Sequence, residues 1–121
     1  MYLVRVKSHF SSAHNLRGYK GKCEDLHGHN WNVELVAQAR DLDNTGMVVD
    51  FTDLKKTLKG CVDELDHTNL NNLDHFREVN PTSENIARYI FEKVSGKSGG
   101  IDIREVTVWE TDSSSATYSA S

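Results

Sequence analysis

The chain has 121 residues, a formal net charge of −4 and 37% hydrophobic residues. This size suits one domain, and the acidic balance excludes a general electrostatic surface for nucleic acid or for an anionic membrane. No apolar run reaches membrane-spanning length, and Arg5 and Lys7 interrupt the N-terminal segment, so we expect a cytoplasmic protein. The only two cysteines are not expected to pair in a reducing cytosol.

The first 40 residues predict two strands joined by a polar loop. Apolar and polar side chains alternate over residues 2–12, with Tyr2 on the apolar face, and the same phase places His14 on that face. A longer alternation over residues 29–40 predicts the second strand. After a turn signal, residues 47–51 are expected to be a short extended piece.

The middle of the chain predicts two amphipathic helices separated by a loop. Apolar side chains recur at helical spacing over residues 53–65, with Thr52 as the expected N-cap. The second helix is expected to begin near Thr82 or Ser83, either of which can cap its free N–H groups. Gly96 is the expected end of this helix.

The last part of the chain predicts a third strand over residues 101–110 and a short fourth strand over residues 116–118. No internal repeat or long linker divides the sequence, so residues 1–121 are expected to form one domain. The pattern predicts an α+β fold, with an antiparallel sheet of about four strands and two helices on one face. We expect the second and final strands to be sheet edges that pair between copies, which predicts a homo-oligomer.

The segment CEDLHGHNW, residues 23–31, carries the densest chemistry in the chain. His27 and His29 are two residues apart on a strand, so their side chains point the same way with roots roughly 6–7 Å apart. If the first two strands pair antiparallel, His14 joins them. Three histidines that bind Zn²⁺ leave a fourth position open, as in catalytic sites. The alternative is that each histidine is an ordinary surface or hydrogen-bonded core residue.

Cys23 lies four residues before the first of these histidines. It is either a further ligand that closes a structural zinc site or a thiol that acts as a base once a nearby cation lowers its pKa. Structural zinc usually takes at least two cysteines, and this loop has one. Asp66 could orient His67 to relay the thiol proton, whereas the simpler alternative is that His67 caps a helix C-terminus.

Glu110 continues the apolar face of Val106 and Val108, where a carboxylate is costly unless it is paired. Such a carboxylate can accept two parallel N–H bonds from a guanidine-like edge, either an arginine or a pterin ring. A solvated glutamate at the end of a strand explains the pattern equally well. A generic zinc hydrolase with Glu24 or Glu110 as its base is a further interpretation.

Six segments of the chain together resemble the pterin synthase family that contains 6-pyruvoyl-tetrahydropterin synthase and the bacterial 6-carboxy-tetrahydropterin synthase. These segments are FSSAH, KCEDLHGHNW, GMVVDFTDLK, LDHTNLN, NPTSENIARYIFEKV and VTVWET. They extend from Phe10 to Thr111, and jointly they are highly specific. The three-residue gap between Cys23 and His27 resembles the 6-carboxy-tetrahydropterin branch.

The resemblance implies a role for each matching residue. The implied zinc ligands are His14, His27 and His29. The implied catalytic residues are Cys23 as the base, Asp66, His67 and Glu110. The residues implied to contact the pterin or its triphosphate are Glu110, Thr82, Ser83 and one of Arg17, Lys20 and Lys22.

The resemblance also implies the tunnelling fold, in rings of commonly two trimers with sites at subunit interfaces, so Asp66 and His67 would serve a neighbour's Cys23. The implied reaction converts 7,8-dihydroneopterin triphosphate to 6-carboxy-tetrahydropterin, acetaldehyde and triphosphate, on the route to queuosine. Glu24 departs from that branch: a branch that forms the folate precursor 6-hydroxymethyl-dihydropterin uses Glu near this position, and the mixed CExxHGH pattern is associated with both activities. The chain could also be a 6-pyruvoyl-type enzyme or a non-catalytic module that binds zinc or a pterin.

Overall fold

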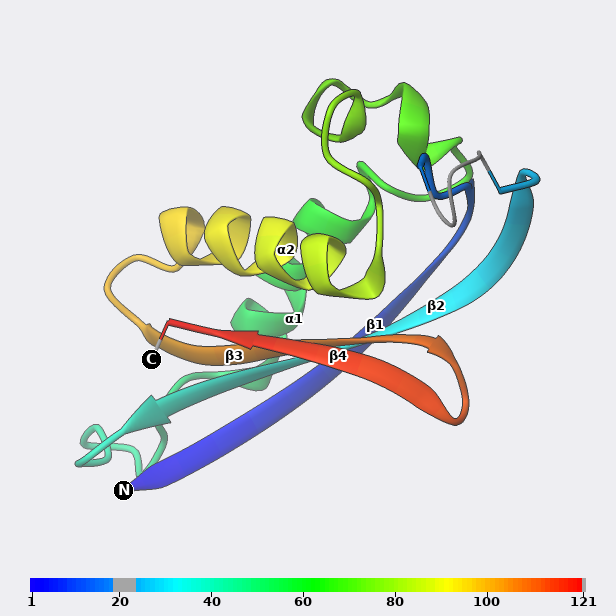
Figure 1. Cartoon of the computed structure of the whole chain (residues 1–121). Coiled ribbons are helices and arrows are strands. Elements are labelled where there is room, and N and C mark those ends of the chain that lie inside the picture. Colours follow the sequence, from blue (N-terminus) through cyan, green and yellow to red (C-terminus); the bar gives the residue numbers. More distant parts are fainter. Residues whose placement is uncertain (19–23, 121) are drawn as a thin grey trace.

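The computed structural model describes residues 1–18 and 24–120, and the centre of the fold is a four-stranded antiparallel sheet (Figure 1). The strands are β1 (Tyr2–His14), β2 (His27–Ala39), β3 (Asp102–Thr111) and β4 (Ser114–Ser119). Their order in space is β1-β2-β3-β4. The expectation that β2 would be an edge is therefore wrong, because β3 returns antiparallel beside it and leaves β1 and β4 outside.

The register of β1 and β2 confirms the pairing expected from their alternation. His14 lies opposite His27, and Ser12 lies opposite His29. One step further along, the rings of Phe10 and Trp31 stack with their centroids 5.7 Å apart. Side chains of one parity thus share one face of both strands, and this face carries the histidines.

Two helices, α1 (Phe51–Val62) and α2 (Ser83–Lys97), cover one face of the sheet (Figure 1). The N-cap of α1 is Asp50, whose side chain accepts from the N–H of Thr52; the expected cap at Thr52 is wrong. Residues 47–50, expected to be a short extended piece, contain a bend at residues 48 and 49 and belong to no strand, and the helix begins at Phe51.

The ends of α2 confirm one expectation and correct another. Thr82 is its N-cap, and the Thr82 hydroxyl accepts from the N–H of Asn85. The helix continues through Gly96 to Lys97, because the left-handed residues that turn the chain are Gly99 and Gly100. Fixing this N-terminus matters for function, since Thr82 and Ser83 belong to the expected pterin contacts.

The hydrophobic core fills the space between the helices and the inner face of the sheet. It contains Leu54, Leu58 and Cys61 from α1, each at most 2% exposed. Burial of a leucine side chain stabilises a fold by roughly 1.5–3 kcal/mol. Cys61 is a free thiol whose pKa is raised by burial, as suits a core residue. Tyr2, expected on the inner face, is half exposed because it lies at the outer end of β1.

The segment between the helices is more ordered than the expected loop. It contains the short 3₁₀ helices η1 (Leu70–Asn72) and η2 (Asp74–Phe76). Before them, the chain follows the outer edge of β1: the N–H of Ala13 donates to the carbonyl of Thr68 at 3.0 Å. The part of this edge nearest to His14 is therefore already paired within the chain. No helix in the described ranges is long and apolar enough to cross a membrane.

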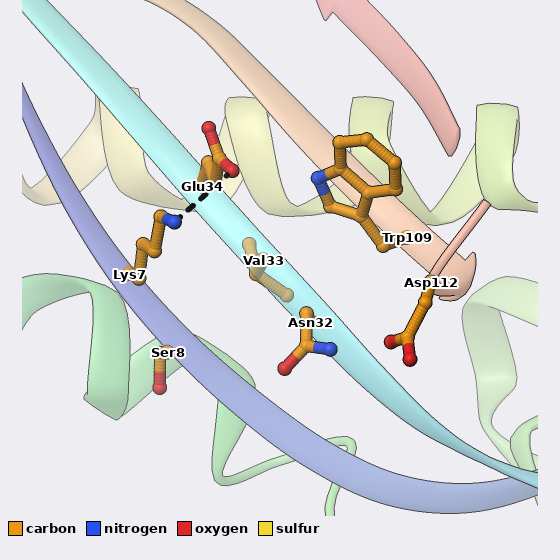
Figure 2. A pocket seen from close by; sticks show the side chains of 7 residues that line it. All are labelled: Lys7, Ser8, Asn32, Val33, Glu34, Trp109 and Asp112. Atoms are coloured by element: carbon orange, nitrogen blue, oxygen red, sulfur yellow. Dashed lines mark ion pairs between the residues drawn. The ribbon is translucent and has the colours of Figure 1, made fainter. Parts of the chain in front are cut away.

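The face of the sheet away from the helices is polar and carries a shallow cavity of about 390 Å³ (Figure 2). Trp109 lies on one side of this cavity, and Glu34 and Lys7 lie on the other. The Glu34 carboxylate is neutralised by two cations, since Lys7 Nζ and Arg5 Nε each lie 3.6 Å from one of its oxygens. Among the described residues, the lining of this cavity contains no histidine or cysteine. The cavity is therefore not the site where the expected zinc ligands meet.

Candidate metal centre and active site

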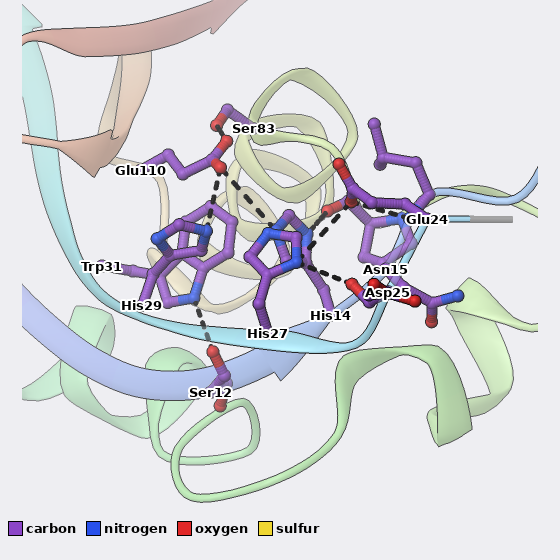
Figure 3. Close-up of polar contacts among 12 residues, drawn as sticks. Ser12, His14, Asn15, Glu24, Asp25, His27, His29, Trp31, Ser83 and Glu110 are labelled. Atoms are coloured by element: carbon purple, nitrogen blue, oxygen red, sulfur yellow. Dashed lines mark hydrogen bonds and ion pairs between the residues drawn. The ribbon is translucent and has the colours of Figure 1, made fainter. Parts of the chain in front are cut away.

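Four side chains from three neighbouring strands meet at one end of the sheet (Figure 3). His14 ends β1, His27 and His29 begin β2, and Glu110 lies near the end of β3. One nitrogen or oxygen atom from each lies within 4.8 Å of those of the others. We call these four residues the metal cluster. The convergence of the three histidines expected from strand phase is thus present, with Glu110 as a fourth member.

His14 is held in one tautomer by its surroundings. Its Nδ1 lies 2.7 Å from the backbone carbonyl of Pro81. A carbonyl oxygen only accepts, so Nδ1 carries the proton and Nε2 presents its lone pair. Nε2 is buried and has no hydrogen-bond partner among the described residues. Burial is the largest influence on this imidazole and lowers its pKa, which favours the neutral form that binds metals.

His27 and His29 complete the set of imidazoles. The Nδ1 of His27 lies 2.8 Å from the carbonyl of Asp25, which fixes the same tautomer as in His14. The Nε2 of His29 is buried, and no hydrogen bond within the described part of the chain satisfies it. The Trp31 indole packs edge-on against His29, with the ring centroids 5.3 Å apart. Imidazoles whose second nitrogen donates to a backbone carbonyl are typical of metal ligands.

Glu110 lies against the histidines, as Figure 3 shows. Its Oε1 is 3.0 Å from Nε2 of His29 and 3.8 Å from Nε2 of His14. Its Oε2 accepts a long hydrogen bond, 3.5 Å, from the hydroxyl of Ser83 at the start of α2. The structure therefore brings Glu110 and Ser83 together, with Thr82 as the preceding N-cap residue.

A support that sequence reasoning missed holds the Pro81 carbonyl in place. The side-chain amide of Asn80 bonds both backbone groups of Arg17: Oδ1 accepts from its N–H, and Nδ2 donates to its carbonyl, both at 2.9 Å. The Arg17 guanidinium donates to the carbonyls of Phe76 and Val79. This arrangement favours a structural role for Arg17 over triphosphate binding. An asparagine before a proline and a helix is the sequence signal that could have pointed to Asn80.

The Asp66–His67 pair lies beside β1 and outside the metal cluster. Asp66 Oδ1 accepts from the N–H of Ser11 at 2.9 Å, and this bond is the largest cause that lowers the pKa of Asp66. The other carboxylate oxygen is 3.0 Å from Nδ1 of His67, so Asp66 does contact the imidazole. His67 does not cap α1, whose C-cap is Asp63. Its side chain is 82% exposed, on a left-handed backbone with φ of 53°.

The loop between β1 and β2 carries the remaining candidates. Cys23 and Lys22, like Lys20, lie outside the described residues. Glu24 is described, and its carboxylate accepts from the N–H of Leu16 at 3.2 Å. The N–H of Glu24 donates in return to the carbonyl of Leu16 at 2.9 Å, and Oε1 lies 3.7 Å from Nδ1 of His27. Glu24 is therefore bound beside the metal cluster and is not a freely solvated loop residue.

Comparisons with known proteins agree with this geometry. The profile of the 6-pyruvoyl tetrahydropterin synthase family matches residues 3–121. A 6-carboxy-5,6,7,8-tetrahydropterin synthase from Synechocystis sp. is 37% identical, over 98% of this chain and 93% of the relative. A dihydroneopterin monophosphate aldolase from Pyrococcus furiosus is 36% identical, over 88% of each chain.

A solved structure shows the same fold. The 6-pyruvoyl tetrahydropterin synthase of Caenorhabditis elegans superposes with a TM-score of 0.82 at 31% identity, over 100% of this chain and 98% of that chain. The expected α+β tunnelling fold is thus confirmed.

Proposed function

Since the chain belongs to the 6-pyruvoyl tetrahydropterin synthase family, we propose that it is a zinc-dependent 6-carboxy-5,6,7,8-tetrahydropterin synthase, an enzyme of the lyase type. Its reaction would convert 7,8-dihydroneopterin triphosphate to 6-carboxy-tetrahydropterin, acetaldehyde and triphosphate. The observation that carries the proposal is the metal cluster, because His14 and His27 have their Nδ1 protons committed to backbone carbonyls, and one ligand atom from each member lies within 4.8 Å of those of the others.

The donor set fits zinc. Imidazole nitrogens are common zinc ligands, and three of them leave room for a substrate oxygen. Bound by His14, His27 and His29, zinc would act as a Lewis acid on the side-chain oxygens of the pterin. The carbonyls of Pro81 and Asp25 would hold two of the three ligands in the tautomer that this requires.

The pterin ring would be recognised by groups at the start of α2 and the end of β3. Glu110 can accept two N–H bonds from the amidine edge of the ring, and Thr82 and Ser83 provide hydroxyls and N–H groups beside it. The 3.5 Å contact between Ser83 and Glu110 supports this assignment, because it places both recognition groups on one side of the metal cluster. Lys22 is the proposed contact of the triphosphate, since its charge is opposite.

The proton transfers are assigned to Cys23 as the base, with Asp66 and His67 as its relay. Asp66 contacts the His67 imidazole as such a relay requires. The pair lies on the outer edge of β1 and outside its own metal cluster, which supports service to a neighbouring copy. We therefore propose a homo-oligomer with shared sites, in which the edges at β1 and β4 pair with other copies. A light-scattering mass near that of one chain would contradict this assembly.

A second candidate activity is cleavage of the substrate side chain to 6-hydroxymethyl-dihydropterin. Glu24 is the candidate second base, because its carboxylate lies beside the proposed ligand His27, 3.7 Å from Nδ1. The sequence relationship to an aldolase from Pyrococcus furiosus is consistent with this activity. Under this hypothesis, Cys23 forms the carboxy product and Glu24 forms the cleavage product.

Incubation of the zinc-loaded protein with 7,8-dihydroneopterin triphosphate, followed by mass spectrometry, tests these assignments. We expect 6-carboxy-tetrahydropterin, and its loss in Cys23→Ala. If Glu24 is a second base, Glu24→Ala selectively lowers the hydroxymethyl product; an unchanged product ratio contradicts that role. A 6-pyruvoyl product would identify the other branch, and binding without turnover would identify a non-catalytic module.

A further inference from the structure

Glu110 occupies an unexpected position for a residue that only recognises the pterin. Its Oε1 points at the metal-binding nitrogens of two histidines, with Nε2 of His29 at 3.0 Å and Nε2 of His14 at 3.8 Å (Figure 3). The carboxylate is therefore a member of the ligand set in this arrangement, although the pterin assignment alone would place it beside that set.

The tautomer of His14 makes a direct contact between these groups unfavourable. Because Nδ1 of His14 donates to the Pro81 carbonyl, its Nε2 presents a lone pair toward the Glu110 carboxylate. Two acceptors that face each other in a buried site repel unless a proton or cation lies between them. Nε2 of His29 lies 3.0 Å from Glu110 Oε1 and likewise has no hydrogen-bond partner among the described residues. A bound cation would satisfy all three atoms.

The distances also fit a shared ion. Zinc bonds of about 2.0–2.1 Å at tetrahedral angles place neighbouring ligand atoms roughly 3.3–3.4 Å apart. The two separations of Glu110 Oε1 from the imidazoles, 3.0 and 3.8 Å, lie on either side of that value. The second carboxylate oxygen is directed to Ser83 and not to the histidines, as in a carboxylate that binds through one oxygen.

We propose that Glu110 is the fourth protein ligand of the metal in the pterin-free state and that substrate binding releases it. This proposal rests on the proposed function, because the amidine N–H donors of the pterin would draw the Glu110 carboxylate away from the metal. Glu110 would then exchange one positive partner for another, and the position it leaves would accept the side-chain oxygens of the substrate. Free enzyme would hold a closed metal site, and only the correct ring would open it.

Zinc affinity without any pterin present tests the ligand role directly. Glu110→Gln keeps the shape and one oxygen acceptor but removes the charge, so a zinc-competition assay with a chromophoric chelator should show at least about tenfold weaker binding. Glu78→Gln is the matched control, because it removes the charge of an exposed carboxylate outside the metal cluster. Its zinc affinity should stay within about twofold of the unaltered protein. Thermal melting of the metal-free proteins verifies that each variant folds.

Cobalt substitution tests the release. The visible spectrum of the Co²⁺-loaded protein should change when 7,8-dihydroneopterin is added, and Glu110→Gln should already differ from the unaltered protein before the addition. Equal zinc affinity and equal Co²⁺ spectra for Glu110→Gln and the unaltered protein, both without pterin, would overturn the proposal. That outcome would leave the proposed reaction intact, because product identity is measured separately by mass spectrometry.

Discussion

The metal cluster and the Asp66–His67 pair both depend on β1, yet they are built in opposite ways. His14, the last residue of β1, is 2% exposed and its imidazole is fixed by a buried carbonyl. The backbone N–H of His67 donates to the carbonyl of Ser11, which lies three residues before His14 in β1. The His67 side chain is nevertheless 82% exposed, on a left-handed backbone. The first arrangement is complete within one chain. The second presents an oriented imidazole outward, as expected of a group that acts on another copy.

The largest expected effect comes from removal of two ligands from the metal cluster. The unaltered protein should bind about one zinc per chain, as a three-histidine site does. The His27→Ala, His29→Ala double variant should lose nearly all of this zinc. Elemental analysis after dialysis measures this loss. The matched control is His67→Ala, which should keep its zinc because the pair lies outside the cluster. Full zinc retention in the double variant would refute the ligand assignment.

Mixing of two inactive variants tests whether the second arrangement serves a neighbour. The His27→Ala, His29→Ala chain lacks a metal site, and the His67→Ala chain lacks the imidazole. If each site combines two chains, co-refolded mixtures should recover about a quarter of full activity, since half the chains carry each intact part and pairing is random. The control is an equal mixture of the two variants, each assembled separately beforehand, which should recover no activity as long as the oligomers do not exchange chains. Absence of recovery would indicate that each chain completes its own site.

The third prediction concerns the support behind the metal cluster. Asn80→Ala removes the bonds that tie the Pro81 segment to Arg17, so His14 loses a fixed hydrogen-bond partner. Changes of this kind typically weaken metal binding by about 10–100-fold. Zinc competition should show this loss for Asn80→Ala and a smaller one for Asn80→Asp, which retains the acceptor oxygen. Asn44→Ala, in an exposed turn, is the control. Unchanged affinity in Asn80→Ala would confine Asn80 to a role in folding.

The sequence predicts the three histidines of the metal cluster but not the contacts that support them. The meeting of His14 with His27 and His29 follows from two alternating patterns and one antiparallel pairing, all of them local or nearly so. The bonds of Asn80 join its side-chain amide to the backbone of Arg17 across 63 positions, and although an asparagine before a proline and a helix marks Asn80, it does not point to Arg17. The position of β2 inside the sheet could not be predicted either, because strand order depends on where β3 returns after two helices.

The left-handed backbone of His67 predicts a smaller effect, on the stability of the fold. Glycine and alanine variants should differ in stability with one sign at His67 and with the opposite sign at His9. His67→Gly and His67→Ala both remove the imidazole, but only glycine adopts φ of 53° without steric cost. The glycine variant should therefore be about 1 kcal/mol more stable than the alanine variant in chemical denaturation. At His9, an exposed position in β1, the order should reverse, because glycine weakens a strand. The same order at both positions would contradict the backbone argument.

The smallest expected effect is the contribution of Asp66 to the pH dependence of the stability of the fold. The N–H of Ser11 holds the pKa of Asp66 below its ordinary value, so its ionised form is favoured in the folded state. A carboxyl with a depressed folded pKa stabilises the fold above its unfolded pKa, about 3.9, and this contribution is lost as the pH falls through the folded value. The difference in stability between the unaltered protein and Asp66→Asn should therefore shrink as the pH falls below about pH 4. Denaturant titrations of metal-free protein at several pH values measure it, and Asp53→Asn, on the exposed first turn of α1, is the control. A difference that stays constant from about pH 5 down to about pH 3 would show that the Ser11 bond does not favour the ionised carboxylate.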